Sequence, residues 1–122
     1  MKAASEAALG SLERRLGYAF ANRDLLLTAL THASATTPAR DTYQRLEFLG
    51  DRVLGLIVTE MLLKAFPKAP EGELSLRLAD LVRKEACAEV ATALSLGEDL
   101  RFGGGKAQRA ALLTTNVLGD VC

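Results

Sequence analysis

Hydrophobic residues recur at intervals of three and four along nearly the whole chain, the spacing that places them on one face of an α-helix. Ser5 and Asn22 are suited to cap the first two helices, and Gly17 is placed to end the first. Pro38 interrupts a small, polar loop at 33–41, and Asn116 is suited to cap a last helix. The pattern predicts helices over about 5–16, 22–30, 43–65, 71–82, 86–94 and 117–122.

No strand-like alternation and no internal repeat occur, so we predict an all-α fold with a single domain over residues 1–122. Hydrophobic residues make up 49% of the chain, enough for a core, and the 5% aromatic content with no Trp makes that core aliphatic. Gly103 to Gly105 lack the Gly-Lys-Ser/Thr ending of a phosphate loop, which favours a plain linker.

The charge balance and the cysteine content indicate which partners and which cellular compartment suit the protein. Fifteen basic residues balance fifteen acidic ones, so nothing in the charge balance argues for a polyanion partner such as nucleic acid, which would have to be held locally. Cys87 and Cys122 have neither disulfide-framework nor metal-ligand spacing, which fits a reducing compartment, and Cys87 is expected in the core. Without a signal peptide or a long apolar run, the sequence indicates a soluble, cytoplasmic protein with no membrane partner.

Residues 44–54 carry the candidate chemistry, because two carboxylates stand in an otherwise apolar helix. At about 100° per residue, Glu47 and Asp51 lie one turn apart on one face, and Gln44 lies a turn earlier. Neighbouring carboxylates repel each other, and a divalent cation such as Mg²⁺ relieves that repulsion. Spacing alone still favours a solvated acidic face, because Glu-x-x-x-Asp pairs are common in helices.

The other faces of this helix predict its packing. Leu46, Val53 and Ile57 form an expected core-facing stripe, with Leu49 and Leu56 beside it. Phe48 falls beyond the carboxylate face, so we expect something outside this core to cover it.

The stretch Gln-Arg-Leu-Glu-Phe-Leu-Gly-Asp-Arg-Val-Leu closely resembles the signature of the ribonuclease III endonuclease domain, commonly Glu-Arg-Leu-Glu-Phe-Leu-Gly-Asp-x-x-Leu. Other segments fall in the same order as in that family. They are Leu-Gly-Tyr-x-Phe at 16–20, Ala-Leu-Thr-His-x-Ser at 29–34, Phe-Pro at 66–67, Glu-Gly-x-Leu-Ser at 71–75 and Leu-Gly-Asp at 118–120.

The resemblance implies an endoribonuclease that hydrolyses double-stranded RNA with Mg²⁺, or alternatively Mn²⁺, and leaves 5′-phosphate and 3′-hydroxyl ends. It implies processing of ribosomal and other structured RNA. Glu47 and Asp120 would ligate the metal, and Asp51 would orient water. Gln44, where the family often has glutamate, and Glu71 would line the cleavage valley. For Glu71 a second role is open, because the helix dipole alone favours an acidic residue at the start of a helix.

The resemblance also implies a homodimer in which Phe48 enters a pocket on the partner subunit. Two equivalent sites related by a two-fold axis would each cut one strand of the duplex. The duplex would be recognised mainly by its shape, as A-form RNA generally is.

Several features depart from the family pattern. The family's second metal-binding glutamate would follow Cys122, so we expect a C-terminally incomplete domain without the double-stranded RNA-binding domain, and with weak or no activity. The alternative is a non-catalytic ribonuclease III-like module that dimerises or holds RNA. His32 has no required role in metal-assisted hydrolysis, and a structural position after a helix end is expected. A solvated surface role is favoured over phosphate contacts for the remaining basic candidates, Arg101, Lys106 and Arg109.

Overall fold

The computed structural model describes residues 2–35 and 41–122, and the regular elements in these ranges are helices, which confirms the all-α prediction. Within them, the only strand-like pairing is an isolated bridge between Thr31 and Arg101. The α-helices are α1 (Lys2–Leu16), α2 (Arg23–Ala29), α3 (Gln44–Ala65), α4 (Glu71–Val82), α5 (Lys84–Ala93), α6 (Lys106–Leu112) and α7 (Thr115–Val121). Two 3₁₀ turns, η1 (Ala33–Ala35) and η2 (Leu96–Glu98), join them.

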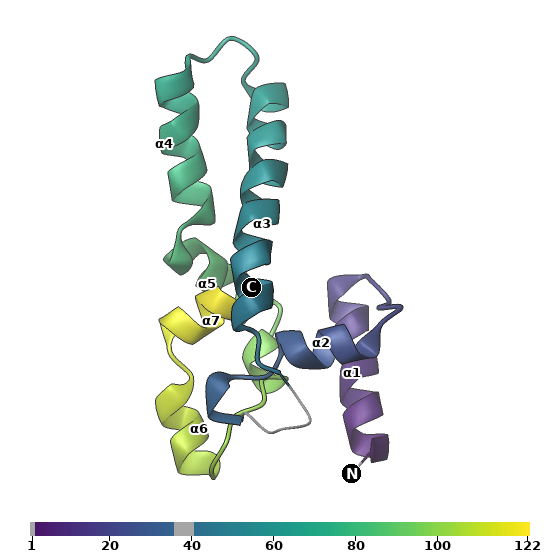
Figure 1. The fold of residues 1–122 in the computed structure, drawn as a ribbon. Coiled ribbons are helices and arrows are strands. Elements are labelled where there is room, and N and C mark those ends of the chain that lie inside the picture. The colour runs from purple at the N-terminus through teal and green to yellow at the C-terminus, as the bar shows by residue number, and fades with distance from the viewer. Residues whose placement is uncertain (1, 36–40) are drawn as a thin grey trace.

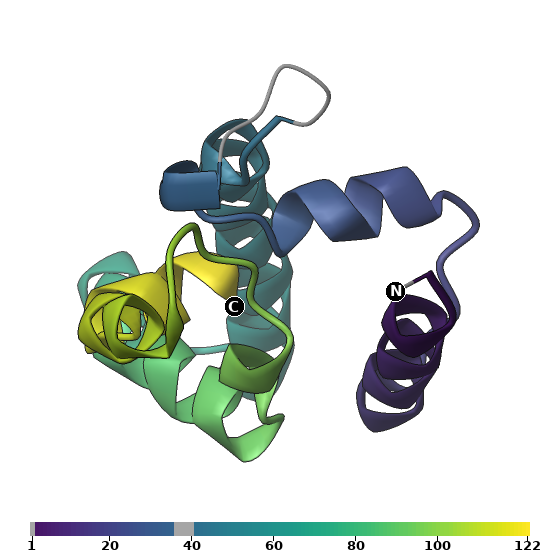
Figure 2. The same cartoon turned by 90° about the horizontal axis from the view of Figure 1, so that it is seen from below.

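The molecule has two parts that meet at the start of α3. α3 and α4 form a long antiparallel hairpin, and the short helices α5 and α7 pack against each other at its base (Figure 1). Seen from below, α1 and α2 form an arm on one side of α3, and α6 and α7 lie on the other side (Figure 2).

The buried core lies among α1, α2, α5 and η2 and not in the long hairpin. It joins residues of α1, α2, α5 and η2, namely Leu9, Leu12, Leu26, Leu30, Ala91 and Leu96. Arg15 connects α1 to the segment that follows α5: it donates a hydrogen bond to the Leu94 carbonyl oxygen (2.9 Å) and forms an ion pair with Asp99. An aliphatic core therefore forms as the composition predicts.

Several predicted helix ends are confirmed. Asn22 caps α2, because its side-chain oxygen accepts a hydrogen bond from the Leu25 backbone N–H (3.3 Å). Gly17 follows the end of α1 with a φ of +68°, a conformation that glycine adopts without strain. The central helix begins within a residue of its predicted start.

Three other ends differ from the prediction. α1 begins at Lys2, so Ser5 lies inside the helix. α5 begins at Lys84, because the extended backbone of Arg83 separates it from α4. Thr114 caps α7 in place of the predicted Asn116: its hydroxyl accepts a hydrogen bond from the Val117 N–H (3.3 Å).

The expected core-facing stripe of α3 is wrong for the single chain. Val53 and Ile57 are about half exposed, and Leu56 is 70% exposed. Leu62 is the buried residue of α3. The reason is that α4 packs along one side of α3, whereas the core described above forms among the other helices.

The glycine-rich connection is packed and not a plain linker. A Cβ atom at Gly103 would lie 2.0 Å from the Ser34 carbonyl oxygen, so only glycine fits there. The Gly103 N–H donates to the Ser34 hydroxyl (2.9 Å), and the backbone of Arg101 pairs with that of Leu30 and His32. This pairing holds the turn at η1, whereas residues 36–40 of the predicted loop lie outside the described ranges.

Candidate active site

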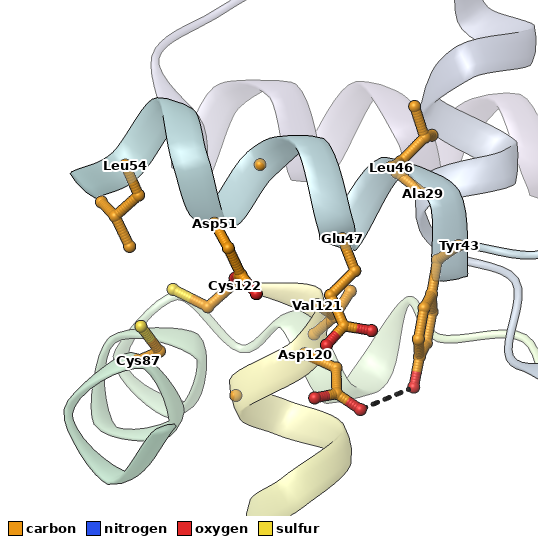
Figure 3. Close-up of a pocket in the computed structure, with 12 residues that line it drawn as sticks. Ala29, Tyr43, Leu46, Glu47, Asp51, Leu54, Cys87, Asp120, Val121 and Cys122 are labelled. Carbon is orange, nitrogen blue, oxygen red and sulfur yellow. Dashed lines mark hydrogen bonds between the residues drawn. The ribbon is translucent and has the colours of Figure 1, made fainter. Parts of the chain in front are cut away.

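A small pocket of about 120 Å³ lies where the first turns of α3 meet the end of α7. Glu47, Asp51 and Asp120 all line it, together with Tyr43 (Figure 3). The structure therefore brings the two carboxylates of the central helix together with the third, which is far away in the sequence.

Tyr43 connects the start of α3 to the pocket. Its side chain is buried, and its hydroxyl donates a hydrogen bond to Asp120 Oδ2 (3.3 Å; Figure 3). Burial, and then the negative charge of Asp120, raise the pKa of the Tyr43 phenol. The phenol therefore stays protonated at neutral pH and remains a donor to this carboxylate.

Asp120 reaches the pocket because α7 lies very close to the start of α5. Val117 buries its side chain, and Gly119 faces Lys84. A Cβ atom at Gly119 would lie 2.6 Å from Lys84 Cγ and 2.8 Å from the Lys84 carbonyl oxygen. Glycine at this position therefore permits the close approach of the two helices and places Asp120 beside the Lys84 side chain.

Lys84 provides a positive charge at the carboxylate cluster. Its Nζ lies 2.8 Å from Asp120 Oδ1, an ion pair in which the lysine side chain is about half exposed. Contact with Asp120 raises the pKa of the Lys84 amine, and the charges of Glu47 and Asp51 add to this effect. Asp120 Oδ1 is itself buried and, among the described residues, accepts no hydrogen bond of regular geometry.

The carboxylates show the repulsion expected of such a cluster. Burial raises the pKa of Glu47, as do its hydrogen bond with Asp120 and the charges of Asp120 and Asp51, while Lys84 opposes them. Asp51 is exposed at the edge of the pocket. A cation bound here would therefore stabilise all three carboxylates.

The carboxylates of the pocket are the type of ligand that a hard divalent cation prefers, but they do not form a complete metal site by themselves. In the described part of the chain, no three Asp, Glu, His or Cys side chains are arranged to bind one ion together. Mg²⁺, however, usually takes only one or two protein carboxylates and completes its shell with water and phosphate oxygens. Glu47 and Asp120, which line the same pocket and include the buried Asp120 Oδ1, are the residues suited to hold it.

Three other predicted residues lie away from the pocket. Gln44 and Phe48 line a separate surface hollow on α3. Glu71 lies at the start of α4, beside the far end of α3, where it lines a different hollow with Leu62 and Ser75 (Figure 1). At 1.5 Å per residue, the distance along α3 from Glu47 to that end is roughly 25 Å. One chain alone therefore does not bring Glu71 to the carboxylates.

Tyr43 and Lys84 are site residues that the sequence reasoning missed. The first had a usable signal, because Tyr43, Glu47 and Asp51 are spaced by four and share a helix face. Lys84 had none, since its place depends on how α5 packs against α7.

The remaining candidates have structural surroundings. His32 Nδ1 lies 2.9 Å from the Ser34 hydroxyl and accepts a hydrogen bond from the Ser34 N–H (3.0 Å). These contacts fit the structural position that was expected for His32. Arg109 donates to the carbonyl oxygens of Leu100 and Gly97 (2.5 Å each), so it holds the backbone around η2 and is not a solvated surface residue. The side chain of Lys106 lies outside the described part of the structure.

Comparison with known proteins identifies relatives over the whole chain. The family model described as Ribonuclease-III-like matches residues 22–122. Ribonuclease 3 of Rhodopseudomonas palustris is 58% identical over 99% of this chain and 45% of its own length, and that of Nitrobacter winogradskyi is 54% identical over 99% and 47%. The nuclease domain of ribonuclease III from Campylobacter jejuni superposes with a TM-score of 0.82 at 37% identity, covering 92% of this chain and 75% of that one. Of the helices described here, none has the length and apolar character needed to cross a membrane.

Proposed function

The chain belongs to the ribonuclease-III-like family, and from this premise we propose that it is an endoribonuclease that hydrolyses double-stranded RNA. The products would carry 5′-phosphate and 3′-hydroxyl ends, and the substrates would be ribosomal and other structured RNAs in the cytoplasm. The chain spans about half the length of the curated relatives it matches. The observation that carries the proposal is the shared pocket of Glu47, Asp51 and Asp120.

The proposed chemistry assigns a separate task to each side chain. Glu47 and Asp120 would hold Mg²⁺, or Mn²⁺ in its place, which would supply a more acidic water and neutralise charge on the scissile phosphate. Asp51, exposed at the edge of the pocket, orients water. Tyr43 and Lys84 each contact one oxygen of Asp120 and so fix the direction in which this carboxylate points.

We propose that the protein acts as a homodimer through one surface of α3. Seven large apolar side chains of this helix are exposed. Leu63 lines the hollow beside α4, and we call the other six the α3 face: Phe48, Leu49, Val53, Leu56, Ile57 and Met61. Contiguous exposed apolar side chains of this kind mark protein–protein interfaces. A second structure of the Campylobacter jejuni nuclease domain is described as flexible in a region involved in dimer formation.

A dimer would also give roles to the two predicted valley residues. Gln44 is exposed at the start of α3, close to the α3 face, and we propose that it lines the valley that holds the duplex. Glu71 can reach the same valley only if the partner subunit brings the far end of one hairpin to the other chain's pocket. RNA binding by this neutral chain alone is expected to be weak.

Cleavage of a labelled RNA duplex tests the proposal, in this chain extended to the length of its relatives, because weak or no activity is expected of the 122 residues alone. We expect Asp51→Asn and Asp120→Asn each to lower the Mg²⁺-dependent cleavage rate by about 100-fold or more, because each removes a charge at the cation site. Asp80→Asn, which changes an exposed carboxylate of α4, is the matched control and should cut like the parent. Cleavage that is unchanged in both pocket variants would disprove the assignment of the site.

The alternative function, a non-catalytic module that dimerises or holds RNA, is favoured by one observation. The ammonium group of Lys84 already pairs with Asp120, where a catalytic cation would bind. Titration calorimetry with Mn²⁺ separates the two functions. If the protein is an enzyme, it should bind Mn²⁺, and Asp120→Asn should abolish that binding. If it is a non-catalytic module, it should bind the RNA duplex without cleaving it and show no saturable Mn²⁺ binding.

A further inference from the structure

Two cysteines far apart in the sequence meet beside the carboxylate pocket. Cys87 is buried on α5, and Cys122 directly follows α7. Both line the pocket that contains Glu47, Asp51 and Asp120. Figure 3 shows the two sulfur atoms turned toward each other across the contact between the helices. They are free thiols. Burial, and then the neighbouring Cys87, raise the pKa of the Cys122 thiol.

The two thiols differ in how accessible they are to solvent. Cys87 Sγ is directed back to its own chain, where it donates to the Val82 carbonyl oxygen (3.7 Å). Cys122 belongs to the exposed residues. An incoming reagent therefore reaches Cys122 first, and Cys87 stands beside it as the second thiol. This is the arrangement of an attacking and a resolving cysteine.

We propose that Cys87 and Cys122 form a dithiol site that reacts with low-molecular-weight disulfides and closes to an intramolecular disulfide. The pair would remain open in a reducing compartment and close when small disulfides accumulate. The inference concerns the thiols beside this pocket and does not depend on the proposed function.

The reaction balances as two thiol–disulfide exchanges. In the first, the Cys122 thiolate attacks one sulfur of the small disulfide, which gives a mixed disulfide and releases one small thiolate. In the second, the Cys87 thiolate attacks the Cys122 sulfur, which forms the Cys87–Cys122 bond and releases the second small thiolate. The protein loses two protons and two electrons, and the small disulfide gains them as two thiols.

Closure would link the same two helices that the ion pair at the pocket links. Lys84 precedes Cys87 by three residues on α5, and Asp120 precedes Cys122 by two on α7. α7 is only seven residues long, and its contacts are mainly with α5. A covalent bond at its end would therefore hold Asp120 in place beside Lys84.

The experiment is incubation of the 122-residue chain with oxidised glutathione, followed by intact-mass measurement under non-reducing conditions. We expect monomer whose mass falls by two hydrogen atoms, with no glutathione attached. We also expect a rise in Tm on the order of 10 °C that a reductant reverses, because the bond closes a long loop.

Single-cysteine variants provide the controls. Cys87→Ala keeps a small apolar side chain in the core and should stop at a stable glutathione adduct on Cys122. Cys122→Ser should react slowly or not at all, because Cys87 is buried. A parent chain that keeps glutathione on Cys122, forms disulfide-linked dimers, or leaves both thiols free would overturn the proposal.

Discussion

The α3 face and the core formed by α1, α2, α5 and η2 are built from the same kinds of residue but have opposite exposure. Leu12 and Leu26, in the core, are 1% and 4% exposed, whereas Leu56 and Met61, on the α3 face, are 70% and 62% exposed. Both regions show helical hydrophobic periodicity in the sequence. Periodicity therefore identifies a helix side that must be covered, but it does not say whether the same chain or a second one covers it.

Substitutions in the two regions should differ most in monomer stability. Leu12→Ala should lower the free energy of unfolding by about 2–5 kcal/mol, because it removes buried side-chain volume and leaves a cavity. Leu56→Ala should change it by less than about 0.5 kcal/mol, because its side chain already contacts solvent. Denaturant titration at concentrations low enough to keep the chain monomeric measures both. Equal losses for the two variants would show that the α3 face belongs to the monomer core.

The second prediction concerns assembly. Phe48 is 64% exposed, with the Arg52 guanidinium 4.0 Å from the centre of its ring. If the α3 face is the dimer interface, Phe48→Ala should raise the dimer dissociation constant about 30-fold, as expected for an aromatic anchor contributing about 2 kcal/mol. Sedimentation over a range of concentrations measures it.

Tyr18→Ala is the matched control, because Tyr18 is an aromatic residue of similar exposure (61%) outside α3. Its self-association should equal that of the parent. A dimer that survives Phe48→Ala at micromolar concentration would rule out insertion of this ring into a partner subunit.

The sequence predicted the helices well because their signals are local. Asn22 and Gly17 act within one turn of the helices that they cap or end, and Pro67 follows the end of α3. Ser5 and Asn116 were predicted as caps but do not act as caps, because local sequence alone does not decide which residue caps a helix. Several residues near each helix end can serve, and tertiary packing decides which one does.

The candidate site was only partly predictable. Glu47 and Asp51 follow from helix geometry, whereas Asp120 entered through the resemblance to a family and not through its spacing. Lys84 could not be found, because it reaches the pocket only where Gly119 lets α7 approach α5. Contacts between segments distant in the sequence leave no periodic trace.

The third prediction tests the boundary between the two regions, where Glu47 of α3 meets Asp120 of α7. Burial and the neighbouring carboxylates raise the pKa of Glu47 in the folded chain above its unfolded value. Folded protein therefore binds this proton more tightly, and stability is lost as pH rises from the unfolded pKa through the raised one. Glu47→Gln removes this loss. In metal-free buffer at about pH 8, the variant should unfold a few degrees above the parent, a gain of at most about 1 kcal/mol because the half-exposed site is screened by solvent.

Lowering the pH provides the internal control for that gain. It should shrink toward zero near pH 4, as Glu47 of the parent becomes protonated in both states. Glu89→Gln, an exposed residue of α5, should show no such pH-dependent gain. Thermal unfolding followed by circular dichroism at several pH values gives both curves. A Glu47→Gln chain that is no more stable than the parent at pH 8 would mean that the carboxylates of α3 and α7 do not repel each other. A bound cation would then have no repulsion to relieve where the two regions meet.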